Sequence, residues 1–144
     1  MRVVSMAVAA GAALLVAAPA AADEWSDQVR RLMDAAAEKF AENGYHYGGY
    51  THEGSLNDDG KDTMTVRLGS GMNSMLIAAC DTDCSDVDLI LYDANGNTVD
   101  SDFELDDFPI VSTTPGRDGV YRLEVQMVAC SANPCRYAIQ QFVK

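Results

Sequence analysis

The feature that most constrains this chain is a change in hydrophobic period at Gly44. Before Gly44, apolar residues recur every three or four positions, whereas after it short β-rich runs alternate with clusters of Gly, Asn and Asp. Short strands at this spacing, with no second helical pattern, are typical of antiparallel sandwiches. We therefore predict a mainly β fold, in which an eight-stranded antiparallel β-sandwich follows one N-terminal amphipathic helix.

The strands alternate between apolar and polar positions. In the fourth run, Val87, Leu89 and Leu91 are predicted to face the core, while Asp86, Asp88 and Ile90 face the other way. The expected strands are Tyr50–Leu56, Thr63–Leu68, Ser74–Cys80, Val87–Tyr92, Thr98–Ser101, Pro109–Thr113, Gly119–Val128 and Arg136–Val143. We expect Gly48-Gly49 to form a short hinge before the first strand.

The segment 23–44 precedes the sandwich, and its helix is expected from about Asp23 to Glu42. Asn43-Gly44 supplies an end signal. One helical face is apolar, and it comprises Trp25, Val29, Leu32, Met33, Ala36 and Phe40. Two interpretations remain open, because this stripe either docks on the domain or binds a partner.

Residues 1–22 have the composition of a secretory signal peptide. Met1-Arg2 gives a positive start, Val3–Ala18 is an apolar run, and Ala20-Ala21-Ala22 supplies small residues for cleavage before Asp23. We expect a periplasmic or secreted mature chain with no membrane span after cleavage.

All four cysteines lie after the predicted cleavage site, so export would place them where disulfides form. The close spacing of CDTDC and CSANPC favours two local disulfides, Cys80–Cys84 and Cys130–Cys135, over either crossed pairing. A zinc site is the alternative, but neither spacing matches the usual C-x2-C knuckle.

Acidic residues outnumber basic ones by 22 to 10, which gives a net charge of −12. This balance disfavours a nucleic-acid partner and an anionic membrane surface, because both require clustered Lys and Arg. The sequence contains no G-x-S-x-G nucleophile elbow, and the cysteines are assigned to disulfides. Composition and motifs thus favour a role without catalysis.

The stretch between Arg67 and Arg117 contains no Lys or Arg, but it carries ten carboxylates. The densest group is Asp81, Asp83, Asp86 and Asp88, in or beside the Cys80–Cys84 ring. Hard oxygen donors in a constrained loop suit calcium, so these four are candidate metal ligands. The alternative is a solvated acidic face that keeps an exported protein soluble.

Several motifs occur in the order found in a known family. They are Gly54-Ser55-Leu56, then Asp86–Asp93 followed by Gly96, then Gly119-Val120-Tyr121. This pattern resembles the bacterial pre-peptidase C-terminal domain, a jelly-roll β-sandwich attached to exported proteins. The resemblance implies a jelly-roll-like sandwich over 45–144. By analogy with collagen-binding members, it also implies calcium at an acidic loop with Glu53, Asn57, Asp58, Asp59 and Asp62.

These features lead to one functional hypothesis and two alternatives. We expect a non-catalytic exported module that binds or stabilises an extracytoplasmic protein or polysaccharide, with structural calcium. One alternative is a small secreted hydrolase that uses paired aspartates. The other is an inhibitor or chaperone of an exported enzyme, with the helix as its contact element. His46 and His52 supply only two nitrogen ligands and are expected to be surface residues.

Overall fold

The computed structural model describes residues 23–144, so the predicted signal peptide lies outside the described residues. One helix precedes eight strands. They are α1 (Glu24–Ala41), β1 (His46–Leu56), β2 (Lys61–Leu68), β3 (Ser74–Cys80), β4 (Cys84–Tyr92), β5 (Thr98–Asp102), β6 (Ile110–Thr113), β7 (Gly119–Cys130) and β8 (Cys135–Val143). The predicted mainly β class, with one N-terminal helix, is confirmed.

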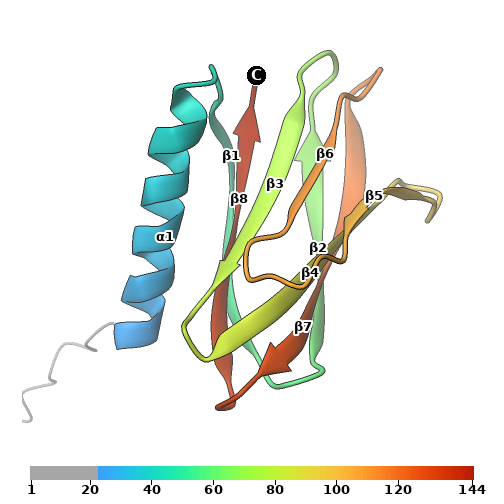
Figure 1. Ribbon diagram of the computed structural model, residues 1–144. Helices are drawn as coiled ribbons and strands as arrows, with labels where there is room; N and C mark the ends of the chain where they lie inside the picture. The colour runs from blue at the N-terminus through green and yellow to red at the C-terminus, as the bar shows by residue number, and fades with distance from the viewer. Residues whose placement is uncertain (1–22) are drawn as a thin grey trace, which may run out of the picture.

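The strands form two four-stranded antiparallel sheets, which we call sheet I and sheet II (Figure 1). Sheet I has the order β1-β8-β3-β6, and sheet II has the order β2-β7-β4-β5. The first strand pairs with the last, the second with the seventh, the third with the sixth and the fourth with the fifth. This is the pairing of one long hairpin rolled into two sheets, so the sandwich is a jelly roll.

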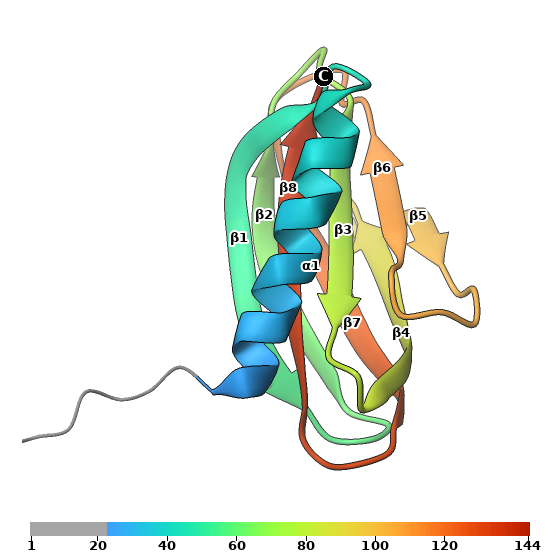
Figure 2. The same cartoon turned by 60° about the vertical axis from the view of Figure 1, so that its left-hand side comes forward.

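The core lies between the two sheets, and sheet I is also covered by α1. Figure 2 shows α1 lying over β8 and β3. Val29 and Met33 of α1 pack against Ala79 and Ala138, whose small side chains allow a close approach. The helix therefore docks through its apolar stripe, although Trp25 and Leu32 at the margins of that stripe are exposed. Among residues 23–144, no helix is long and apolar enough to cross a membrane.

The predicted hinge at Gly48-Gly49 is wrong, because β1 begins at His46 and continues through both glycines. The pairing register with β8 shifts between Tyr47 and Thr51, which marks an irregularity in the strand. Gly49 has φ +96°, and a Cβ on Gly48 would lie 2.7 Å from the Gln141 side chain. The glycines thus allow an irregular strand to continue, where the sequence pattern indicated a break.

Both predicted disulfides are confirmed, and both link the two sheets at one end of the sandwich. Cys80–Cys84 joins the end of β3 to the start of β4, and Cys130–Cys135 joins the end of β7 to the start of β8. Cys84 and Cys130 are direct neighbours in the β4–β7 register. The four cysteines therefore share one end of the molecule, which we call the disulfide end.

Candidate functional site

The four predicted metal ligands divide into two environments. Asp81 lies inside the Cys80–Cys84 loop, and only 1% of its surface is exposed. Its Oδ2 accepts the backbone N–H of Arg136 at 2.6 Å, and its Oδ1 accepts that of Asp83 at 3.2 Å. The buried charge is thus satisfied by backbone donors, as a structural carboxylate requires.

Asp83 contributes to the same loop mainly through its backbone. Its carbonyl oxygen accepts the backbone N–H of Ser131 at 2.8 Å and the Ser131 hydroxyl at 2.9 Å. These bonds fix the Cys80–Cys84 loop against the β7–β8 connection. The roles of Asp81 and Asp83 are therefore to hold the disulfide end together.

Asp86 and Asp88 form a different site on the face of β4 that points away from the core. Only 7% and 8% of their surfaces are exposed, so this part of the outward face is buried rather than solvated. The chain after β5 runs alongside β4 there. Asp102 pairs with Leu89, and the Asp106 carbonyl accepts the backbone N–H of Val87 at 3.0 Å. We call Asp86 and Asp88 the β4 carboxylate pair.

The β4 carboxylate pair is electrostatically unfavourable when both groups are ionised. Burial raises the pKa of Asp88 to about 6, and the negative charges of Asp86, Asp102 and Asp106 add to this increase. Burial also raises the pKa of Asp86, with a further contribution from Asp106. The Asp86 Oδ1 atom is buried and has no hydrogen-bond partner among the described residues. A buried acceptor without a donor is rare in folded proteins.

The neighbouring carboxylates of the β5–β6 region are already engaged. Asp100 Oδ2 accepts the backbone N–H of Ser112 at 2.7 Å, and Asp102 Oδ2 accepts that of Ile110 at 2.9 Å. These two bonds connect β5 of sheet II to β6 of sheet I. Asp106 Oδ1 accepts the N–H of Phe108 at 2.9 Å. Asp86 Oδ1, by contrast, has no such donor within residues 23–144.

The structure does not bring the four predicted ligands together as one metal centre. Among residues 23–144, no three His, Cys, Asp or Glu side chains are arranged so that they could hold a metal ion. The acidic loop implied by the family resemblance is also engaged elsewhere. Glu53 pairs with Arg30 at 3.3 Å, Asp58 accepts the Cys130 N–H, and Asp62 accepts the Tyr137 hydroxyl.

Sequence reasoning missed a polar contact between the sheets at β1 and β2. Tyr137 of β8 donates its hydroxyl to Asp62 Oδ2 at 3.1 Å, and His52 Nε2 lies 3.2 Å from that hydroxyl. Burial, followed by the charge of Asp62, raises the pKa of Tyr137. His52 is partly buried in this contact, whereas His46 is exposed. No sequence signal marked this contact, because its members come from three strands.

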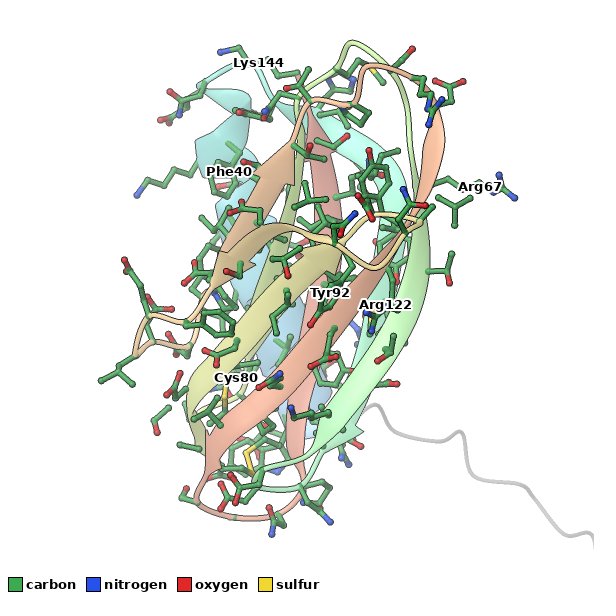
Figure 3. All side chains as sticks on the ribbon, turned by 90° about the vertical axis from the view of Figure 1, so that its right-hand side faces the viewer. Phe40, Arg67, Cys80, Tyr92, Arg122 and Lys144 are labelled. Carbon is green, nitrogen blue, oxygen red and sulfur yellow. A yellow bond between two sulfur atoms is a disulfide. The ribbon has the colours of Figure 1, made fainter. Side chains whose placement is uncertain are left out.

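Sequence reasoning also missed a basic region on sheet II. The Arg122 guanidinium lies 3.9 Å from the centre of the Tyr92 ring, and the two residues are cross-strand neighbours on β7 and β4 (Figure 3). Arg67 projects from the edge of the same sheet in Figure 3. Arg67 and Arg122 are more than fifty positions apart in the sequence, so no local motif marks them.

No protein-family model matches the chain, and no curated protein matches it.

Proposed function

We propose that this protein is a non-catalytic exported binding or stabilising module, and that calcium bound at the β4 carboxylate pair stabilises its fold. The observation that carries the proposal is the buried Asp86 Oδ1, which lies beside the similarly buried Asp88 and has no hydrogen-bond partner within residues 23–144. A divalent cation would satisfy this oxygen and neutralise the repulsion between the pair and its acidic neighbours.

The chemistry of the pair favours calcium over softer metals. Both ligands are hard carboxylate oxygens, and neither histidine nor free cysteine belongs to the site. Calcium takes six to eight oxygen ligands, so two carboxylates would leave several positions to water and to backbone carbonyls. Such a site is expected to bind weakly, with a Kd on the order of 10⁻⁴ to 10⁻³ M, as in extracellular modules.

Two further observations support an exported, non-catalytic role. The two disulfides fit an oxidising compartment outside the cytoplasm. Only 7% of the surface of Asp86 and 8% of the surface of Asp88 are exposed. Hydrolysis by paired aspartates needs an accessible cleft between them, so this arrangement favours the binding module over the hydrolase. The jelly-roll topology fits the resemblance to pre-peptidase C-terminal domains, which we retain as a proposal.

Isothermal titration with calcium chloride tests the proposal directly. The oxidised mature chain is expected to bind one calcium ion, whereas the D86N/D88N double variant should show no measurable binding. A matched control is D34N/E38Q, which removes the same charge from two exposed positions on α1 and should bind as wild type does. Absence of calcium binding by wild type, or equal binding by D86N/D88N, would overturn the site.

A further inference from the structure

A second region of sheet II differs in charge from the rest of this acidic protein. Three adjoining hollows, of about 550, 430 and 210 Å³, meet at Ala94 and Val120, at the end of the sheet opposite the disulfides. Arg67, Arg122 and Arg117 each line one of the three. We call this surface the arginine hollow.

The arginines of the hollow have few protein partners. Among residues 23–144, Arg67 and Arg117 are exposed and have no carboxylate within 4.0 Å. Arg122 lies 3.7 Å from Glu124, but Lys61 contacts the same carboxylate at 3.7 Å. The Tyr92 ring holds the guanidinium of Arg122 in place. The positive charge of the hollow is therefore only partly neutralised.

The two aspartates of the hollow are occupied by loop backbone. Asp93 Oδ1 accepts the N–H groups of Asn95 and Asn97, each at 2.9 Å, and these bonds lower the pKa of Asp93. Asp118 Oδ1 accepts the N–H of Ser70 at 2.8 Å. Both aspartates thus fix the walls of the hollow instead of pairing with its arginines.

From this arrangement we infer that the arginine hollow binds a polysaccharide that carries carboxylate groups, such as a chain of uronic acids. The planar guanidinium fork matches a carboxylate through two parallel hydrogen bonds. Val120, 40% exposed, and Ala94 form an apolar floor on which a sugar ring can pack. Asp118 and the amide of Asn95 line the same hollow and can bond to sugar hydroxyls, whereas both oxygens of Asp93 already accept hydrogen bonds from Asn95 and Asn97.

The same mixture of charges disfavours an acidic peptide. A polypeptide rich in Glu or Asp would meet the arginines, but it would also approach the carboxylates of Asp93 and Asp118 without hydroxyl groups to donate to them. Each sugar of a uronate chain carries a carboxylate for the arginines and hydroxyl groups that can donate to the aspartates. The hollow therefore suits an acidic sugar better than an acidic protein segment.

Titration with oligogalacturonate, at an ionic strength of about 0.15 M and with a chelator present, tests the inference. The chelator separates this test from the calcium proposal. Wild type should bind the oligosaccharide. The R67Q/R117Q variant should bind at least about tenfold more weakly, because each lost charged hydrogen bond is worth about that factor. The matched control R31Q/K39Q, which removes two exposed charges from α1, should stay within about twofold of wild type.

Three results would overturn the inference. The first is an absence of binding by wild type, and the second is equal binding by R67Q/R117Q and wild type. The third is binding of poly-L-glutamate as tightly as oligogalacturonate, which would show recognition of charge alone. Dextran serves as the neutral polymer and should not bind. The melting temperature of R67Q/R117Q should match that of wild type, because both side chains are exposed and unpaired.

Discussion

Asp81 and Asp86 lie five positions apart, and both are buried, yet their surroundings are opposite. Asp81 sits in the loop of the disulfide end and accepts two backbone N–H groups. Asp86 sits on the outward face of β4, and one of its oxygens has no hydrogen-bond partner in the part of the chain that the structure describes. The Asp81 carboxylate stabilises the loop through these hydrogen bonds, whereas an ionised Asp86 raises the energy of the folded state unless a cation or proton neutralises it.

The difference follows from where free backbone donors are available. In a loop, N–H groups turn inward and can surround a carboxylate. In the middle of a sheet, N–H groups are already paired: those of β4 bond to the neighbouring strands β7 and β5 and, at Val87, to the Asp106 carbonyl. An aspartate on such a strand face must find side-chain donors, and the neighbours of Asp86 and Asp88 are themselves acidic. Local backbone geometry thus separates a structural carboxylate from a candidate ligand.

The largest expected effect on stability comes from replacing Asp81, whose two carboxylate oxygens accept backbone hydrogen bonds. The Asp81→Ala variant would leave the N–H groups of Arg136 and Asp83 without an acceptor in a buried loop. We expect a loss of about 3 kcal/mol in the free energy of unfolding, because each hydrogen bond to a charged group contributes about 1.5–3 kcal/mol. Urea unfolding under oxidising conditions measures the loss. A loss below about 1 kcal/mol would show that the hydrogen bonds of Asp81 do not stabilise the disulfide end.

An intermediate effect is expected from opening the loop that holds Asp81. Replacing Cys80 and Cys84 with alanine removes a five-residue ring, which the loop-entropy model values at about 2 kcal/mol. The calcium response of the variant should persist, because Asp86 and Asp88 lie outside the ring. Loss of calcium binding in this variant would show that the two regions are coupled. Non-reducing peptide mapping should find only the two local disulfides in wild type.

A smaller effect of opposite sign is expected at the β4 carboxylate pair. Without calcium, Asp88→Asn should stabilise the protein at neutral pH by on the order of 1 kcal/mol, because it removes a buried charge. The raised pKa of Asp88 means that the folded state holds a proton more tightly than the unfolded state. Protonated Asp88 therefore adds to the free energy of unfolding of wild type at about pH 4, and this contribution is lost as the pH rises through about 6.

Urea unfolding at several pH values, with a chelator present, measures this slope. The stability difference between Asp88→Asn and wild type should widen between about pH 4 and about pH 7 and then level off. A difference that does not change with pH would show that Asp88 ionises in the folded state as it does in the unfolded chain.

The sequence predicted the fold because the fold depends on local patterns. The alternation of Val87, Leu89 and Leu91 placed β4, and the spacing of the cysteines indicated their pairing. The limits of β1 were missed because Gly48 and Gly49 resemble a hinge until their contacts with β8 are known. Burial of Trp25 and Leu32 was overestimated because a helical stripe is wider than the surface that sheet I offers it.

The candidate site could be predicted only in part. The run of acidic residues identified Asp86 and Asp88, but it grouped them with Asp81 and Asp83, whose hydrogen bonds depend on the distant Arg136 and Ser131. Asp86 and Asp88 are buried on the outward face of β4, where the period-two pattern alone predicts solvated side chains. The arginine hollow depends on the jelly-roll topology, which brings Arg67 and Arg117 together from strands β2 and the β6–β7 connection.

Thermal melting with and without calcium, at matched ionic strength, tests the central claim most directly. A ligand that binds only the folded state at four times its Kd stabilises it by about 1 kcal/mol, or about 3 °C. At roughly 2 mM calcium, the melting temperature of wild type and of D34N/E38Q should rise by this amount, while that of D86N/D88N should not change. Equal melting of wild type in calcium and in chelator, or an equal rise in D86N/D88N, would contradict a calcium site at the β4 carboxylate pair.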